Sequence, residues 1–164
     1  MSDIKLWGWD KKVRTMLRFI KTGDIFCFKL DEKRYCFGRI MAKCMVGHFA
    51  EIFDYISNDT VIEMDDIKNA SRLTSIVILD SYSLFDRKTE GEWRIIGRQE
   101  DYTPTDAEDI YFAWGIGSGC RKSNIFDDTI SISEEESRSL PKLSSNGDWV
   151  IRRQVFECLN EPMQ

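Results

Sequence analysis

Few side chains in this chain have the types and spacing that acid–base or nucleophilic chemistry requires. The 164 residues include one histidine, His48, which follows Gly47 at the mouth of an expected hairpin. Nucleophilic catalysis needs a base to activate the nucleophile and a third group to orient that base. No local pattern supplies both partners, so the sequence predicts a structural histidine. A pair of His48 with Cys44 or Cys120, in a small enzyme, is the open alternative.

The cysteines match no metal-binding pattern. They are odd in number, and no two of them are spaced as CxxC. With a single histidine to add, they cannot be arranged as a zinc ligand set of the usual spacing. We therefore expect neither a metal nor a cofactor, and we predict free thiols that pack as small apolar residues in a reducing cytoplasm. The five are Cys27, Cys36, Cys44, Cys120 and Cys158.

A glycine-rich stretch and several carboxylate pairs suggest ligand chemistry more directly. Residues Gly115-Ile116-Gly117-Ser118-Gly119 could cradle a phosphate, because glycines leave backbone N–H groups accessible. A dinucleotide site would need a helix to follow, and residues 120–128 are a poor helix, which favours a surface loop. Residues 54–66 lack the glycine and the ligand offsets of a calcium loop, and the carboxylate runs are Asp65-Asp66, Asp127-Asp128 and Glu134-Glu135-Glu136. They predict solvated acidic surface, with a protein partner as the functional alternative.

Charge is distributed unevenly along the chain. The net charge is −5 and the isoelectric point is about 5.0. Residues up to Thr22 are basic, whereas residues 100–136 contain ten carboxylates opposed only by Arg121 and Lys122. This balance speaks against a general nucleic-acid binder and favours a basic partner. No segment is long and apolar enough for a membrane span or a signal peptide, so we expect a cytoplasmic protein.

The hydrophobic pattern predicts a single mainly β domain of the α+β class over residues 1–164. We expect a strongly bent antiparallel sheet or a small barrel with an N-terminal helix; an open sheet with one packed helix is the alternative. Residues 129–146 are Ser/Glu-rich and are expected to be exposed or mobile. The expected helices are 11–21 and 64–70, and the expected strands are 25–30, 35–44, 48–56, 75–84, 91–97, 110–114, 130–133 and 149–156.

Alternation along one expected strand allows a further function. Tyr35, Phe37 and Arg39 lie on one face, an arrangement that can stack RNA bases on a barrel surface. The same alternation is equally typical of a core face, which is the interpretation that we prefer. An RNA-binding small β-barrel protein is therefore kept as the alternative function.

Several phrases together resemble the immunity protein 26 family over residues 12–115. They are the run Phe19-Ile20-Lys21-Thr22-Gly23-Asp24-Ile25-Phe26-Cys27-Phe28-Lys29-Leu30, then Tyr35-Cys36-Phe37-Gly38-Arg39-Ile40, Ala50-Glu51-Ile52-Phe53-Asp54-Tyr55 and Gly91-Glu92-Trp93-Arg94-Ile95-Ile96-Gly97. The resemblance implies an antidote that binds and blocks a toxin of a polymorphic or contact-dependent growth inhibition system. It implies no catalytic residues. The shared residues are expected to be structural: glycine turns at Gly23, Gly38 and Gly97, and aromatic anchors at Phe26, Tyr35, Phe53 and Trp93.

The expected partner is the C-terminal domain of the cognate toxin, bound one-to-one by a monomer. Many toxins of these systems are nucleases and therefore basic, which suits an acidic binder. Neither a nucleic acid nor a membrane is an expected partner. We predict that the toxin-binding residues lie in the acidic second half, where the candidates are Asp101, Asp106, Glu108, Asp109, Asp127 and Asp128.

Overall fold

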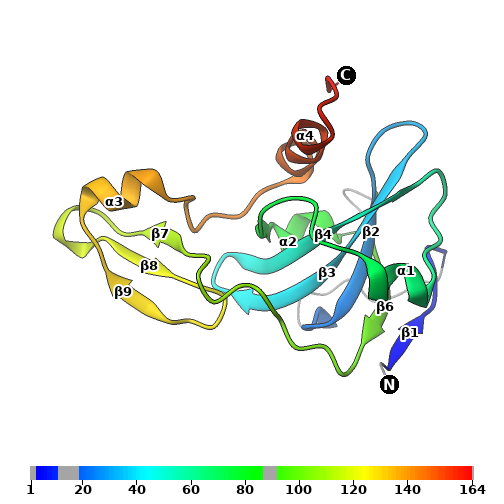
Figure 1. Ribbon diagram of the computed structural model, residues 1–164, viewed down its shortest axis with the longest axis horizontal. Helices are drawn as coiled ribbons and strands as arrows, with labels where there is room; N and C mark the ends of the chain where they lie inside the picture. The colour runs from blue at the N-terminus through cyan, green and yellow to red at the C-terminus, as the bar shows by residue number, and fades with distance from the viewer. Residues whose placement is uncertain (1–2, 11–18, 87–91, 164) are drawn as a thin grey trace.

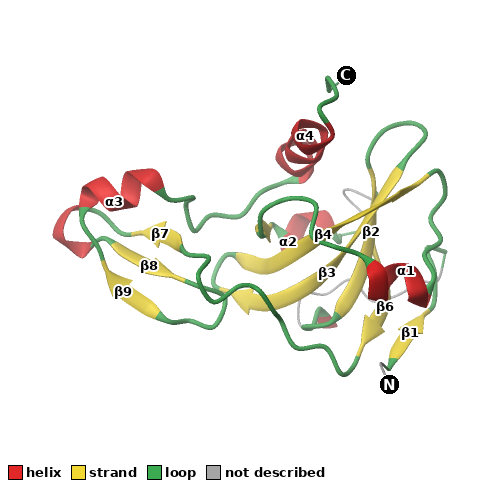
Figure 2. Ribbon diagram, viewed as in Figure 1, coloured by secondary structure: helices red, strands yellow, loops and turns green. Residues whose placement is uncertain are grey.

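The computed structural model describes residues 3–10, 19–86 and 92–163, which form two antiparallel sheets and four α-helices (Figures 1 and 2). The larger sheet has six strands in the order β1-β6-β2-β3-β4-β5. In that order they are Ile4–Leu6, Trp93–Gln99, Asp24–Lys29, Tyr35–Cys44, Gly47–Ser57 and Val77–Leu79.

The second sheet has three strands, in the order β7-β8-β9, and lies at the opposite end of the molecule from the β2–β3 hairpin loop (Figure 1). Its strands are Phe112–Trp114, Arg121–Ser123 and Thr129–Ser131. The helices are α1 (Met64–Asn69), α2 (Ser81–Leu84), α3 (Glu134–Ser139) and α4 (Asp148–Leu159).

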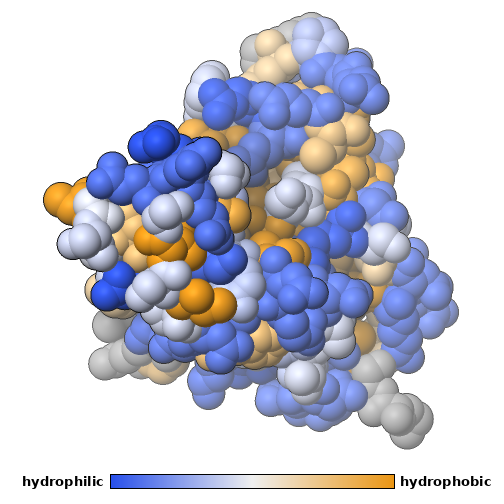
Figure 3. Space-filling view, turned by 60° about the vertical axis from the view of Figure 1, so that its left-hand side comes forward, coloured by the Kyte–Doolittle hydropathy of each residue, from blue (hydrophilic) through white to orange (hydrophobic). Residues whose placement is uncertain are grey.

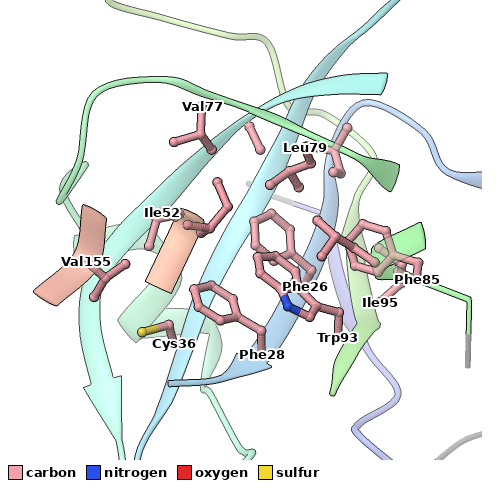
Figure 4. Close-up of a cluster of buried hydrophobic side chains, with 14 of the residues drawn as sticks. Phe26, Phe28, Cys36, Ile52, Val77, Leu79, Phe85, Trp93, Ile95 and Val155 are labelled. Atoms are coloured by element: carbon pink, nitrogen blue, oxygen red, sulfur yellow. The ribbon is translucent and has the colours of Figure 1, made fainter. Parts of the chain in front are cut away.

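Both faces of the large sheet are buried at its centre. In β2, Ile25 to Phe28 are fully buried, so alternate residues point into two different clusters. On one face Phe28 stacks on Trp93, with ring centroids 4.0 Å apart, beneath α2 and α4 (Figure 4). Burial on both sides explains why β2 reads as a nearly continuous apolar run rather than as an alternating pattern.

The α+β class with mainly antiparallel sheets is confirmed, but the small barrel is wrong. The two edge strands of the large sheet, β1 and β5, do not pair, so the sheet stays open. Register shifts in the β2–β6 and β3–β4 pairs insert extra residues, which increase local bend and twist without closing the sheet. Of the N-terminal helix predicted at 11–21, residues 11–18 lie outside the described residues, and residues 19–21, which are described, are not α-helical.

The strand predicted at 149–156 is also wrong, because this segment forms the longest described helix, α4. Ile151, Val155 and Phe156 are its buried residues, a spacing of four and five that lies on one face of a helix. Asn160 ends the helix in the left-handed conformation, which asparagine tolerates. The predicted strand 75–84 is shorter than expected, since α2 begins directly after β5.

The segment after α3 joins the two sheets. Ala113 of β7 donates to Pro141 and accepts from Leu143, at 2.8 and 2.9 Å. Three residues later the N–H of Asn146 donates to the carbonyl of Ile78 in β5, at 2.8 Å. Residues 141–146, called here the strap, thus make short parallel bridges to both sheets. They hold the small sheet and α4 to the body of the protein.

Two of the expected glycine turns prove to be close approaches inside strands. Gly23 does precede β2 with a φ of +94°, as a turn glycine would. Gly38 and Gly97 instead lie within β3 and β6. At Gly38, a Cβ atom would collide with the carbonyl oxygen of Glu51 and with the Phe26 ring. Phe26, Phe53 and Trp93 are buried anchors as predicted, and Tyr35 is partly buried.

We predict that Gly38→Ala destabilises the protein by about 2–3 kcal/mol, because the new methyl group has backbone on one side and a buried ring on the other. Gly119→Ala is the matched control, since nothing lies within 4 Å of its Cβ position and its φ is not positive. Urea unfolding monitored by tryptophan fluorescence measures both. Equal stabilities for the two variants would contradict the close packing at Gly38.

Candidate functional site

His48 is structural rather than a general base open to substrate. Its Nδ1 atom lies 2.7 Å from the Ser81 hydroxyl, and both residues are buried. The Ser81 hydroxyl also reaches the Leu79 carbonyl, at 3.3 Å. No hydrogen bond joins His48 to Cys44 or Cys120 in the part of the chain that is described. Burial, and secondarily the charge of Lys43, lower the pKa of His48 to about 4, which removes it from the range of a base at neutral pH.

The other candidates for ligand chemistry also have structural explanations. The five cysteines are free, and burial raises the pKa of Cys36 to about 12. The described residues contain no group of three metal-ligating side chains. The glycine-rich stretch is the exposed turn between β7 and β8, with positive φ at Gly115 and Gly117 and no helix after it. A predicted surface loop is therefore what the structure has there.

The suspected RNA platform on β3 is a packing face. Phe37 is fully buried and packs against Tyr55, with ring centroids 5.5 Å apart. Arg39 donates from Nε and Nη2 to Glu51, at 3.0 and 2.9 Å. Bases cannot stack on a ring that is inside the core, so this face offers no platform of the expected kind.

Glu51 of β4 is the centre of a nearly buried polar cluster. One of its carboxylate oxygens accepts from Arg39 and from the Tyr102 hydroxyl, the latter at 3.1 Å. The other accepts from Arg72 at 3.4 Å. The Arg39 guanidinium also lies over the Tyr102 ring, 4.1 Å from its centroid. We call Glu51, Arg39, Arg72 and Tyr102 the Glu51 cluster.

Residues 101–128, called here the acidic segment, carry the six predicted toxin-binding carboxylates. The Glu51 cluster positions the first part of this segment. Tyr102 follows Asp101 directly, and Arg72 donates to the carbonyl oxygens of Thr105 and Asp106, both at 3.0 Å. Asp106 itself has a positive φ of 55° and an exposed side chain. The chain that carries these carboxylates is therefore fixed to the large sheet by charge-assisted hydrogen bonds from Arg72, whose guanidinium also binds the nearly buried Glu51.

Asn124, which is buried, positions the rest of the segment. Its Nδ2 atom donates to the Glu108 carbonyl and to the Asp128 carboxylate, each at 3.1 Å. Its Oδ1 atom accepts from the backbone N–H groups of Phe126 and Asp128, at 3.0 and 3.1 Å. The side chain thereby satisfies its full hydrogen-bonding capacity. It holds the β8–β9 turn beside the chain at Glu108.

Asn124 joins the two backbone segments that carry four of the six predicted acidic residues. It bonds to the Glu108 carbonyl and to the Asp128 carboxylate, Asp109 and Asp127 are the sequence neighbours of these two residues, and all four are exposed. Asp106 precedes this group by two residues. Asp101 lies next to β1, where its carboxylate accepts from the N–H of Asp3, and that hydrogen bond lowers the pKa of Asp101.

Sequence reasoning missed the apolar side chains that the small sheet exposes. Trp114 is 42% exposed, Ile116 88%, Phe126 43% and Ile130 47%. Figure 3 shows this end of the molecule, where apolar side chains are interspersed among polar ones. The sequence gives little sign of these exposed residues, because they lie in three-residue strands or in the turns between them, where no hydrophobic period can be measured. Exposed apolar and aromatic side chains that are bordered by polar residues are typical of protein–protein interfaces.

The comparisons agree with the resemblance seen in the sequence. A family model described as immunity protein 26 matches residues 21–124. No curated protein and no solved structure matches the chain. Among the described residues, no helix has the length and apolar character needed to span a membrane.

The buried His48 predicts a specific dependence of stability on pH. Its folded pKa of about 4 is below the unfolded value, so unfolding takes up a proton between pH 6.5 and pH 4. Stability is therefore lost as pH falls through this window, by up to about 3 kcal/mol. Glutamine cannot titrate, so we expect the free energy of unfolding of His48→Gln to fall less than that of the wild type over this pH range. Urea unfolding of both proteins from pH 7 to pH 4 tests it, and parallel curves would contradict it.

Proposed function

The chain belongs to the immunity protein 26 family, and we propose that it binds and neutralises the C-terminal domain of a cognate bacterial toxin. Proteins of such families are generally inhibitors without enzymatic activity. The proposed toxin is a basic nuclease of a polymorphic or contact-dependent growth inhibition system. Binding takes place in the cytoplasm of the producing cell, with one antidote monomer for each toxin domain.

The observation that carries this proposal is the rigid support beneath the acidic segment. Two buried polar centres, Glu51 and Asn124, fix the chain that presents Asp106, Glu108, Asp109, Asp127 and Asp128. Surface carboxylates on a backbone that is held in place lose less freedom when a cation approaches than carboxylates on a flexible chain do. They are therefore suited to matching a fixed basic surface, such as the one with which a nuclease holds its substrate.

Electrostatics also favour a basic partner over other macromolecules. The carboxylates between residues 100 and 128 outnumber the two cations, Arg121 and Lys122, and Lys122 pairs with Glu136 at 2.8 Å. Complementary charge speeds the encounter between proteins, and close charge pairs in tight complexes couple by about 1.5–7 kcal/mol. The same field repels nucleic acid, which leaves protein binding as the use for this surface.

The proposal is tested by expressing the chain together with the toxin domain encoded directly upstream of its gene. We expect a stable complex with one copy of each protein by size-exclusion chromatography and light scattering. We also expect that an equimolar amount silences the toxin in vitro. If no complex forms, or if an added nucleic acid is bound in place of the toxin domain, the proposed function is wrong.

Within such a complex, we predict that Asp127→Lys combined with Asp128→Lys weakens binding at least tenfold. The reversal replaces attraction by repulsion at the centre of the acidic group. Asp127→Asn with Asp128→Asn should fall between this variant and the wild type. Asparagine is chosen because it tolerates the φ of 69° at position 127 and keeps hydrogen-bonding capacity at both positions.

The matched control is Glu32→Lys with Glu92→Lys. It changes the net charge equally, at two exposed residues of the cleft beside the β2–β3 hairpin, at the other end of the molecule (Figure 1). Isothermal titration calorimetry gives the dissociation constants, and circular dichroism verifies the fold. A dissociation constant that is unchanged at positions 127 and 128 would place the interface elsewhere.

A further inference from the structure

Strand β9 presents an open sheet edge. Its residues Thr129 to Ser131 are all exposed, and it is the outermost strand of the small sheet (Figure 1). In β8–β9, Asn124 donates to the Asp128 carbonyl and Ile132 donates to the Cys120 carbonyl. The pair Lys122–Ile130 lies midway between these two pairs. Hydrogen-bonded pairs recur every second residue, so Ile130 faces β8.

It follows that the backbone of Thr129 and Ser131 points away from the sheet. Each of these residues directs one N–H and one C=O outward. Within the part of the chain that the structure describes, no strand pairs with this side of β9. The edge therefore offers four backbone hydrogen-bonding groups in the spacing that an added strand would need.

The other sheet edges are covered or charged. The strap covers β7 through its bonds with Ala113 and covers the edge at β5 through Asn146. Strand β1 carries the exposed Lys5, a residue that commonly blocks edge-to-edge pairing. By contrast, β9 has the sequence Thr-Ile-Ser, without lysine, proline or a bulge in its register with β8. Of the usual protections against edge pairing, β9 has its short length, which leaves its outward backbone groups available to an added strand.

We propose that β9 is the docking edge for an extended segment of the toxin domain, which joins the small sheet as a fourth strand. This inference rests on the proposed function and names how the partner is held. Backbone pairing with Thr129 and Ser131 supplies the main contact, and the exposed Ile130 packs against an apolar side chain of the added strand.

The charge around the edge selects a basic segment as the occupant. Asp127 and Asp128 precede the strand, and Glu134 and Glu135 follow it on α3. All four carboxylates are exposed. Lysine or arginine residues at the two ends of an added strand would meet carboxylates at each end, although Glu134 already lies 4.0 Å from the exposed Arg138. A second copy of this chain would instead bring like charges together, which disfavours pairing of two β9 edges.

The position of β9 along the chain supports a partner-specific role. The family model ends at residue 124, directly before the β8–β9 turn. Strands β2 to β8 thus lie inside the matched region, and β9 lies outside it, as do β1 and α4. A surface that recognises one particular toxin is expected in a part of the chain that the family does not share.

The first test is hydrogen exchange in the wild-type protein, free and bound to the toxin domain encoded upstream. We expect the amides of Thr129 and Ser131 to exchange fast in the free protein and at least tenfold more slowly in the complex. The amide of Ile130 already faces β8 and serves as an internal reference. A complex in which the two edge amides exchange as fast as in the free protein would overturn the inference and leave the proposed function standing.

The second test removes one outward donor. Ser131→Pro deletes the Ser131 N–H, and edge strands accept proline where that group faces solvent. We expect at least tenfold weaker toxin binding with an unchanged fold. Ser131→Ala keeps the N–H and should bind within twofold of the wild type. Equal binding by Ser131→Pro would overturn the inference. Should proline unfold the small sheet, the exchange experiment on the wild type decides alone.

Two further outcomes separate the possible causes of failure. If no complex forms at all, the proposed function fails and the inference falls with it. If protection of Thr129 and Ser131 appears without toxin and grows with protein concentration, then a second copy of this chain pairs with the edge. That result would overturn the assignment of a toxin segment as the occupant.

Discussion

The packing of the acidic segment on the large sheet depends on the hydrogen bonds that the Glu51 carboxylate accepts. Glu51 is 7% exposed, and it accepts hydrogen bonds from two arginines and a tyrosine that come from three separate parts of the chain. A charge buried to this extent is strongly unfavourable unless every lone pair is used. Burial, and then the charge of Glu51, raise the pKa of Tyr102, so the phenol stays protonated and donates. Removal of any one partner would leave a nearly buried oxygen of Glu51 with fewer hydrogen bonds, and the shared cluster thereby couples the large sheet to the acidic segment.

A second constraint is the connection between the two sheets. The small sheet has strands of three residues, too short to be stable alone, and it relies on Phe112 packing against Phe49 and on the bridges of the strap. The strap continues into α4, whose Ile151 and Val155 enter the same core as Phe26 and Trp93. Loss of packing at α4 would therefore also loosen the distant small sheet. The fold thus places the small sheet on a framework that is held at both of its ends.

The sequence predicts the centre of this framework and misses its periphery for physical reasons. Strands β2, β3 and β4 were predictable because long apolar runs between polar turns leave little choice of structure. The pattern of α4 predicts a strand, because Trp149 to Ile151 are consecutive apolar residues and mask the helical spacing of Ile151 and Val155. The Glu51 cluster joins residues 12 to 51 positions apart, and no local pattern reports such contacts. Of the six predicted acidic residues, the grouping of four depends on Asn124, whose role is visible only in three dimensions.

Acidic side chains and an open backbone edge would contribute to different stages of toxin binding. Carboxylates act at long range, so they raise the association rate and lose effect as salt screens them. Backbone pairing acts only at contact, so it mainly lowers the dissociation rate. Backbone hydrogen bonds also form with nearly any sequence in the added strand. The side chain of Ile130 and the flanking residues would therefore have to distinguish one partner from another. Because β9 follows directly from the turn that Asn124 fixes, the same side chain would align both contributions: it orients the carboxylate of Asp128 and sets where the edge begins. An inhibitor of this kind needs no deep cleft and no reactive group. It needs a rigid turn that brings charge and strand edge to one place.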